Sequence, residues 1–239
     1  MSFRPLPRRF DSSQPEHMDL PDADPLLLMD DLKNLRNINR FLGGHSALRK
    51  HIRPFLENSN GRPVTTVLDM ATGSADHPLA LVDLARRLGR PVSITAIDSN
   101  PHMVETSRRR TAHVPAITVL RGDIRYPEWP DGSFDFVLCS LALHHFSLEV
   151  AREIVCSMRR LSRVGFIVND LQRSRLGEAA AWLWTRTTTR NPMTRNDAVV
   201  SVQRGFNKEE LAEMGTESGV RRFSVHREPF FRLVLVGEH

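Results

Sequence analysis

Short apolar runs that alternate with helix-length segments constrain the fold of this chain most. The runs lie at 65–69, 93–97, 117–121, 134–140 and 165–169, and the segments 78–88, 101–110 and 148–161 between them carry apolar residues at helical spacing. Such alternation is typical of a mostly parallel sheet with helices on both faces. Segments 223–227 and 231–236 resemble two further strands joined by a turn. We therefore expect an α/β fold with a doubly wound, mostly parallel seven-stranded sheet.

Three segments fall outside this alternation. Residues 1–24 are rich in proline, serine and charge without a sustained period, which predicts a flexible N-terminal arm. Residues 25–57 carry two helical patterns separated at Gly43-Gly44, and we expect them to form a helical cap. Residues 171–206, after the fifth strand, have helix-like pieces and are the natural place for a substrate-covering insertion. Because 239 residues are too few for two ordinary domains, we expect 25–239 to form one domain.

Composition argues against several classes of protein. The formal net charge is +5, but the arginines are scattered and no basic stripe is interleaved with aromatic residues, so we expect no nucleic-acid partner. No apolar stretch approaches the roughly 20 residues that cross a bilayer, and no apolar signal segment follows the basic start. We therefore expect a cytoplasmic protein without stable membrane insertion. Cys139 and Cys156 are the only cysteines, and they indicate neither a disulfide framework nor a zinc site.

Residues 69–76 form the first candidate binding loop. The apolar pair Val67-Leu68 ends in an acid and is followed by mostly small side chains, in the order Asp69-Met70-Ala71-Thr72-Gly73-Ser74-Ala75-Asp76. Small side chains let the backbone approach a ligand closely, and ligands of open α/β sheets bind at the carboxyl ends of strands. The sequence therefore predicts a ligand site after the first strand.

Two further strands also end in an acid. Asp98 follows the second strand, where a carboxylate can accept hydrogen bonds from both hydroxyls of a ribose. Asp123 and Ile124 follow the third strand, where the carboxylate can accept from an adenine amino group and the aliphatic side chain can cover the ring. Acids at three successive strand ends indicate a nucleoside cofactor.

With these acids in place, residues from about 60 to 170 resemble class I S-adenosylmethionine (SAM)-dependent methyltransferases. The resemblance implies SAM as cofactor, with the 69–76 loop around its methionine part, Asp98 at the ribose and Asp123 at the adenine. Segment 131–140 is similar to the family's fourth-strand motif, which implies that the backbone of Ser140 and Leu141 lies beside SAM. The cofactor-binding residues implied in this way are Asp69, Met70, Ala71, Thr72, Gly73, Asp76, Asp98, Ser99, Met103, Asp123, Ile124, Ser140 and Leu141.

The loop departs from the family in its glycines. Ala71 and Ala75 stand where the usual pattern has glycine, and only Gly73 remains. Alanine is the smallest replacement where the backbone φ is negative, so we expect SAM binding to be retained. The same departure argues against a pyridine-nucleotide dehydrogenase, which needs glycine where the pyrophosphate approaches the backbone.

His144 and His145 follow the fourth strand and are the candidate catalytic residues. An imidazole titrates near neutral pH, so one of them could act as general base toward the methyl acceptor. The alternative is a pair exposed to water at the start of a helix. Adjacent residues on a helix cannot both face one site, so we expect at most one to be essential. No third ligand has suitable spacing in the sequence, and we therefore expect no metal.

A closer resemblance connects the chain to small-molecule methyltransferases of the ubiquinone/menaquinone type and to those associated with bacterial type III polyketide synthases. It is carried by segments 34–45, 141–146, 169–171 and 189–197. It implies that the N-terminal helix closes over SAM, with Arg40 as partner of the methionine carboxylate; the alternative for Arg40 is a surface charge. It also implies O-methylation of a phenolic or enolic hydroxyl on a polyketide-type or lipid-like aromatic. We expect Asn169, Asp170 and the insertion to line the acceptor pocket.

Other functions stay open at this point. They are C-methylation of a quinone precursor, RNA or protein methylation, and a non-catalytic SAM-binding scaffold. Ser140-Leu141-Ala142-Leu143 stands where amide-recognising methyltransferases carry an Asn-Pro-Pro-Tyr-like tetrapeptide, which argues against RNA or protein methylation. The three strand-end acids argue against a scaffold. The sequence also leaves a homodimer open.

Overall fold

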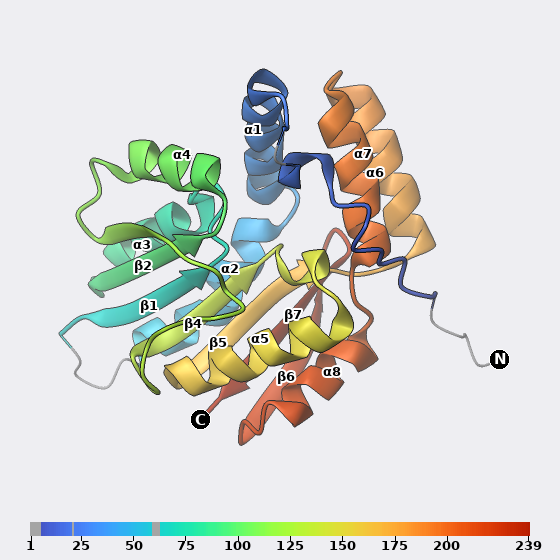
Figure 1. Cartoon of the computed structure of the whole chain (residues 1–239). Helices are drawn as coiled ribbons and strands as arrows, with labels where there is room; N and C mark the ends of the chain where they lie inside the picture. Colours follow the sequence, from blue (N-terminus) through green and yellow to red (C-terminus); the bar gives the residue numbers. More distant parts are fainter. Residues whose placement is uncertain (1–5, 21, 59–62) are drawn as a thin grey trace.

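The fold is built around one seven-stranded sheet. The computed structural model describes residues 6–20, 22–58 and 63–239. The strands lie in the order β3-β2-β1-β4-β5-β7-β6 (Figure 1), and β7 runs antiparallel to both of its neighbours while the other pairs are parallel. This arrangement confirms the predicted doubly wound sheet. The bounds are β1 Thr65–Met70, β2 Val92–Asp98, β3 Ile117–Arg121, β4 Phe134–Ser140, β5 Ser162–Leu171, β6 Arg222–Glu228 and β7 Arg232–Glu238.

Helices cover both faces of the sheet. On one face lie α2 (Gly44–Glu57), α3 (Asp76–Arg87) and α4 (Pro101–Thr111), and on the other lie α5 (Leu148–Leu161) and α8 (Lys208–Glu217), which stand in front in Figure 1. Within the described residues, no helix has the length and apolar character that crossing a membrane requires.

Strand β1 contributes to two apolar cores, one on each face of the sheet. In β1, Val67 packs with the helices of one face, while Leu68 and Met70 pack with those of the other. All three side chains are fully buried, as side chains that alternate between the two covered faces of a parallel sheet should be. Burial of each such side chain stabilises the fold by about 1.5–3 kcal/mol. The alternation therefore fixes the register of β1 and with it the position of the loop that follows.

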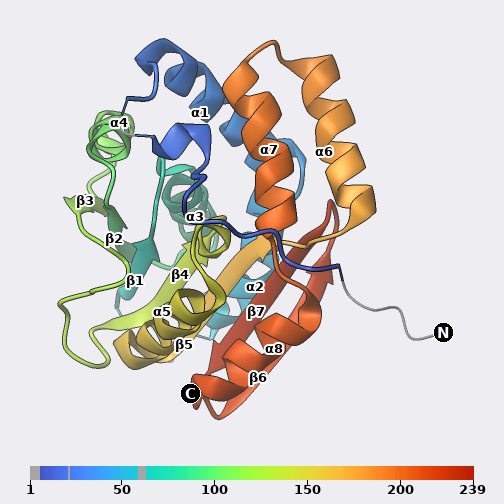
Figure 2. The same ribbon diagram turned by 45° about the vertical axis from the view of Figure 1, so that its right-hand side comes forward.

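Three helices form a cap over the ends of the strands. They are α1 (Pro25–Phe41), α6 (Arg175–Thr188) and α7 (Pro192–Arg204), which stand above the sheet in Figures 1 and 2. Asp24 and Asn191 cap α1 and α7 with their side-chain oxygens, and a proline follows each cap, where its missing N–H costs nothing. The cap thus combines the predicted N-terminal helix with two helices from the predicted insertion.

The N-terminal segment crosses the molecule between α1 and α7 (Figure 2). The backbone N–H groups of His17 and Met18 each donate to the Asp197 carboxylate at 3.0 Å, and the Arg8 guanidinium donates to the Arg204 carbonyl at 2.6 Å. The sequence pattern of the predicted flexible arm does not indicate these contacts, because their acceptors lie on α7, far away in the sequence. Residues 1–5 and 21 of the predicted arm lie outside the described residues.

Candidate active site

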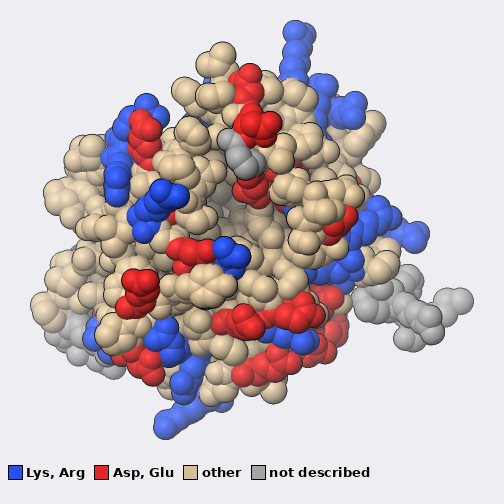
Figure 3. Space-filling view, in the orientation of Figure 1, with Lys and Arg blue, Asp and Glu red and all other residues tan. Residues whose placement is uncertain are grey.

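A cavity of about 410 Å³ lies between the cap and the ends of β1 and β4. A hollow near the centre of one face is visible in Figure 3, and its walls are mostly uncharged residues, with acidic side chains at the rim. Six of the predicted cofactor-binding residues and both predicted catalytic residues line the cavity: Ala71, Thr72, Gly73, Asp76, Ser140, Leu141, His144 and His145. The fold therefore brings part of the predicted cofactor-binding site and the predicted catalytic histidines to one cavity.

The loop after β1 has an unusual backbone. Ala71, Gly73 and Ala75 have φ values of 57°, 56° and 57°, so every second residue lies in the left-handed region. The expectation of negative φ at the two alanines is thus wrong. A left-handed alanine costs about 1–2 kcal/mol, which the surrounding contacts must offset. A Cβ placed on Gly73 would meet nothing within 4 Å, so this part of the loop is open to a ligand.

Two of the strand-end acids are buried beside the loop, and one of them holds it in place. Asp98 is buried and accepts hydrogen bonds from the N–H groups of Gly73 at 2.8 Å and Asn100 at 3.0 Å. Asp69 is buried beneath the loop, and burial, reinforced by the charges of Asp76 and Asp98, raises its pKa to about 7. Its Oδ2 atom has no hydrogen-bond partner among the described residues.

Asp76 begins α3 and joins the loop to the cap. It accepts from the Asn39 amide of α1 at 2.9 Å and lies 3.3 Å from Nε2 of His45. Burial alone would raise its pKa, but the contacts with His45, Asn39 and the neighbouring His77 hold it well below its usual range. Asp76 therefore presents a stable negative charge to the cavity.

Arg232, at the start of β7, is a positive group that the sequence did not single out. Its side chain is buried and donates to the Leu42 carbonyl at 2.9 Å and to Asn39 Oδ1 at 3.3 Å. The remaining Nη1 atom is buried with no hydrogen-bond partner among the described residues, and Arg232 lines the cavity. A free guanidinium nitrogen at a cavity wall suits a carboxylate.

The other predicted cofactor residues, Asp69 and Asp98 among them, lie around the cavity and do not line it. Arg40 is exposed on α1, where its guanidinium stacks on Phe41, as in the surface alternative. Asp123 pairs with Arg125 at 2.6 Å, which lowers the pKa of this carboxyl. Ser99 is exposed after β2. Met70, Met103 and Ile124 are buried in apolar clusters.

His144 is held by a carboxylate from the neighbouring strand. It lies in the 3-10 turn η2 (Leu143–His145), and its Nδ1 is 2.6 Å from Oδ1 of Asp170 at the end of β5. Asp170 also accepts from the backbone N–H of His144 at 3.2 Å and of Leu171 at 2.7 Å. Both side chains are buried. This contact fixes the ring and leaves Nε2 directed toward the cavity.

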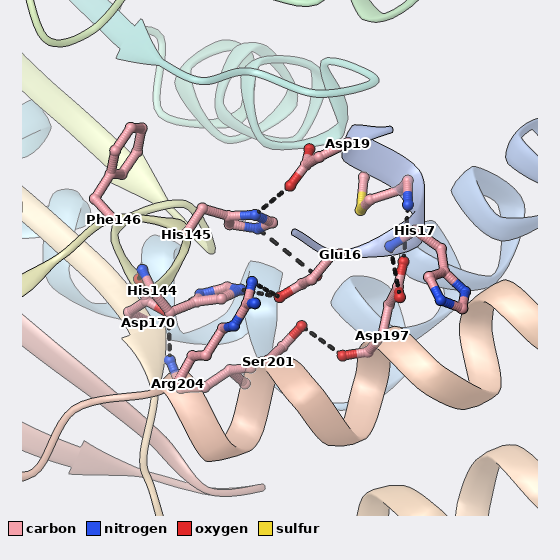
Figure 4. A network of polar contacts seen from close by, with 12 residues as sticks. Glu16, His17, Asp19, His144, His145, Phe146, Asp170, Asp197, Ser201 and Arg204 are labelled. Atoms are coloured by element: carbon pink, nitrogen blue, oxygen red, sulfur yellow. Dashed lines mark hydrogen bonds and ion pairs between the residues drawn. The ribbon is translucent and has the colours of Figure 1, made fainter. Parts of the chain in front are cut away.

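His145 is held in the same way by the N-terminal segment. Its Nδ1 lies 2.7 Å from Oδ2 of Asp19 (Figure 4), and the two imidazole centroids are 4.4 Å apart. Burial lowers the pKa of His145, but the carboxylates of Glu16 and Asp19 outweigh it and raise that pKa to about 10. Both histidines line the cavity because they share one tight turn. The premise that adjacent residues cannot both face one site is therefore wrong for this turn, and the expectation that at most one of them is essential stays a prediction.

Glu16 faces both histidines and was not predicted from the sequence. It is 1% exposed, and its carboxylate oxygens lie 3.7 Å from Nε2 of His144 and 3.9 Å from Nε2 of His145. Arg204 on α7 lies 3.9 Å from the same carboxylate. Residue 16 belongs to a segment without periodicity, so no sequence signal identifies it.

The insertion contributes to the cavity only in part. Trp184 lines it, whereas Trp182 and Leu183 are exposed and Phe206 is buried in the core beneath. Asn169 and Asp170 are fully buried, and neither lines the cavity. Asp170 therefore acts on the cavity through His144.

Comparison with known proteins identifies the domain. Residues 67–165 match the family model described as a methyltransferase domain. A demethylmenaquinone methyltransferase from Staphylococcus haemolyticus is 25% identical over 120 residues, which are 50% of this chain and 46% of that protein. The chain spans about a third to a half of the length of the curated relatives it matches.

Solved structures share the fold over most of the chain. A SAM-dependent methyltransferase from Aquifex aeolicus has a TM-score of 0.61 at 17% identity, covering 87% of this chain and 96% of that one. The magnesium protoporphyrin IX methyltransferase of Synechocystis, solved with bound S-adenosylhomocysteine, has a TM-score of 0.59 at 13% identity, covering 93% and 91%. Residues 67–165 therefore match a methyltransferase domain, and the solved structures show that the chain has the fold of SAM-dependent methyltransferases.

Proposed function

We propose that this chain transfers the methyl group of SAM to the hydroxyl of a phenolic or enolic small molecule of polyketide-type or lipid-like character. The observation that carries the proposal is the histidine pair that shares one cavity with the loop after β1. Each histidine is held by a carboxylate, His144 by the buried Asp170 and His145 by Asp19, an arrangement that orients an imidazole for proton transfer. The curated relatives match only part of this chain, so the reaction and its acceptor are our proposal for the chain as a whole.

The side chains around the loop suit the groups of SAM. Asp98 would accept from the ribose hydroxyls, Asp76 would face the ammonium group, and Arg232 would bind the carboxylate in place of the predicted Arg40. The open backbone at Gly73, which lines the cavity, is consistent with a ligand at this position. When bound, SAM supplies an activated methyl group on its sulfonium.

The cap supplies an apolar wall for the acceptor. Leu32, Leu35, Trp184 and Phe230 line the cavity from three different elements, so an aromatic or lipid-like acceptor would bury apolar surface there. Enclosure by the cap excludes water and holds the acceptor oxygen in line with the donor. Such positioning alone can contribute about 7–11 kcal/mol to lowering the barrier.

His144 would take the proton of the acceptor hydroxyl. Asp170 holds Nδ1 of this histidine at 2.6 Å, so the Nε2 atom that faces the cavity is free to accept a proton. His145 lies beside it as the second member of the pair and would stabilise the negative charge that develops on the acceptor oxygen. Transfer of the methyl group then gives the methyl ether and S-adenosylhomocysteine.

The demethylmenaquinone methyltransferase relative supports a second acceptor class, a quinol methylated at carbon. The experiment is to incubate the purified chain with SAM and with alkylresorcinols, alkylpyrones and demethylated quinols in parallel. S-adenosylhomocysteine should form together with a product heavier by one methyl group, and NMR of that product distinguishes an O-methyl from a C-methyl. Formation of neither product with any acceptor, in a chain that binds SAM, would favour the scaffold alternative.

A further inference from the structure

We infer that Glu16, His144 and His145 form a binding site for a divalent transition-metal ion that faces the acceptor cavity. The inference deepens the proposed function, on which it rests, because it assigns the ionisation of the acceptor oxygen to a metal ion at the same three side chains.

The distances favour a metal site over direct hydrogen bonds. Nε2 of His144 and Nε2 of His145 lie 3.7 and 3.9 Å from the two oxygens of Glu16, and all the potential ligand atoms lie within 4.8 Å of one another. Charge-assisted N–H···O hydrogen bonds measure about 2.7–2.9 Å, so these contacts are too long for them. Two ligands bound at about 2.1 Å to one ion in tetrahedral geometry lie roughly 3.4 Å apart, which is close to the observed separations.

In both histidines a carboxylate contacts the ring nitrogen that would not bind the metal, as is usual for metal-binding histidines. Nδ1 of His144 lies 2.6 Å from Asp170, and Nδ1 of His145 lies 2.7 Å from Asp19. A carboxylate on one ring nitrogen fixes the tautomer and orients the other nitrogen toward a metal. Figure 4 shows the two rings side by side with Glu16 facing them. The same pattern at both histidines is more than general base catalysis needs, because one oriented imidazole suffices.

The third ligand is buried and only partly satisfied. Glu16 is 1% exposed, and its Oε1 atom has no hydrogen-bond partner among the described residues. Nη1 of Arg204 approaches Oε1 to 3.9 Å, which is too far for a hydrogen bond, while Nη2 of Arg204 donates to the Gln14 carbonyl. The cationic groups around Glu16 all lie beyond hydrogen-bond distance, and a metal ion at the centre of the three ligands, taking the place of the imidazole protons, would pair with the buried carboxylate directly.

The ligand set indicates the kind of ion. Two imidazole nitrogens and one carboxylate suit zinc, manganese or iron(II), whereas magnesium and calcium prefer oxygen ligands. Three protein ligands leave coordination positions open, and all three residues line the cavity. An acceptor hydroxyl can therefore bind the ion as its oxyanion while its proton passes to water. In this state the imidazoles are ligands, so the metal ion replaces the free base described above.

The test uses Co²⁺ as a probe, because its visible absorption reports coordination geometry without any need for SAM or an acceptor. Chain stripped with a chelator is titrated with Co²⁺, and we expect one equivalent to bind with the absorption of a four- or five-coordinate site. Glu16→Gln and His145→Gln should each weaken binding at least tenfold, as loss of one ligand predicts. His17→Gln is the matched control, since His17 is exposed in the same short helix as Met18 and Asp19.

His145→Gln also guards against misfolding, because His145 is less buried than Glu16, and thermal melts check each variant. A folded wild-type chain without one-equivalent binding, or binding that survives both substitutions, would overturn the inference. Methylation that continues undiminished after chelation would overturn the metal ion's role and leave the proposed function standing. Conversely, a chain that binds Co²⁺ at these residues but does not bind SAM would contradict the proposed function alone.

Discussion

His144 and Asp170 come from two different strand ends, and their side chains meet at 2.6 Å in a fully buried contact at the base of the cavity. His144 follows β4 and Asp170 ends β5, and these strands are hydrogen-bonded neighbours up to the pair Ser140 and Asn169. The contact is therefore a direct result of the sheet order. It determines which nitrogen of His144 faces the cavity.

Substitution of Asp170 should impair catalysis and spare cofactor binding. Asp170→Asn keeps the size of the side chain but weakens its hold on His144, and we expect turnover to fall about 10–100-fold, as for other carboxylates that orient a functional histidine. Affinity for SAM should stay within twofold, because Asp170 does not line the cavity. Steady-state kinetics with an accepted phenol and calorimetry with SAM measure the two effects. Equal losses in both would point to a general structural role.

Because the backbone of Ala71 is left-handed, we expect a glycine at this position not to destabilise the fold. Ala71→Gly relieves about 1–2 kcal/mol of backbone strain, which offsets the extra entropy of the unfolded chain, so we expect stability equal to or above that of the wild type. Ala80→Gly is the control. It lies inside α3, where glycine costs about 1 kcal/mol. Urea unfolding followed by circular dichroism compares them, and equal destabilisation by both substitutions would argue against the left-handed loop.

Asp31 makes stability depend on pH. Burial, reinforced by the charges of Asp197 and Glu16 and opposed by a hydrogen bond from Thr194, raises the pKa of Asp31 from 3.8 to about 7. Between these two values the folded chain keeps a proton that the unfolded chain has lost, so stability falls as the pH rises. Asp31→Asn removes this dependence and keeps an oxygen that can accept from Thr194.

The stability difference between Asp31→Asn and the wild type should therefore increase in favour of the variant from about pH 4 to about pH 7 and then level off. Thermal melts across this range measure it. Glu153→Gln, an exposed carboxylate on α5, serves as the control for loss of a surface charge. A difference that decreases with rising pH would contradict the assignment to Asp31.

Arg232 should be important for stability as well as for the cavity. Arg232→Leu leaves the Leu42 carbonyl and Asn39 Oδ1 without their buried donor, and we expect a loss of about 2–4 kcal/mol. Arg227→Leu on β6 is the matched control, because that arginine is exposed and should change stability by less than about 0.5 kcal/mol. Chemical denaturation distinguishes the two. Similar losses of unfolding free energy in the two variants would show that the hydrogen bonds of Arg232 contribute little to stability.

Much of the fold followed from local patterns. The strands and helices of 65–169 could be predicted because their apolar spacing and terminal acids are local properties, and β3, β4 and α5 have the expected bounds. The loop conformation at Ala71 could not, because left-handed φ at alanine is imposed by the surrounding structure. Glu16 and Arg232 were missed for a related reason. Each acquires its role only when segments distant in the sequence pack together, at α7 for Glu16 and at α1 for Arg232.

The most direct test of the account is calorimetric titration of the purified chain with SAM and with S-adenosylhomocysteine, for the wild type and Asp98→Ala. We predict one site for each ligand in the wild type and at least tenfold weaker binding in the variant, which corresponds to about 1.4 kcal/mol or more and is reasonable for loss of a carboxylate that accepts from ribose hydroxyls. A thermal melt checks that the variant is folded. Absence of binding by the folded wild-type chain would contradict the assignment of this cavity to SAM.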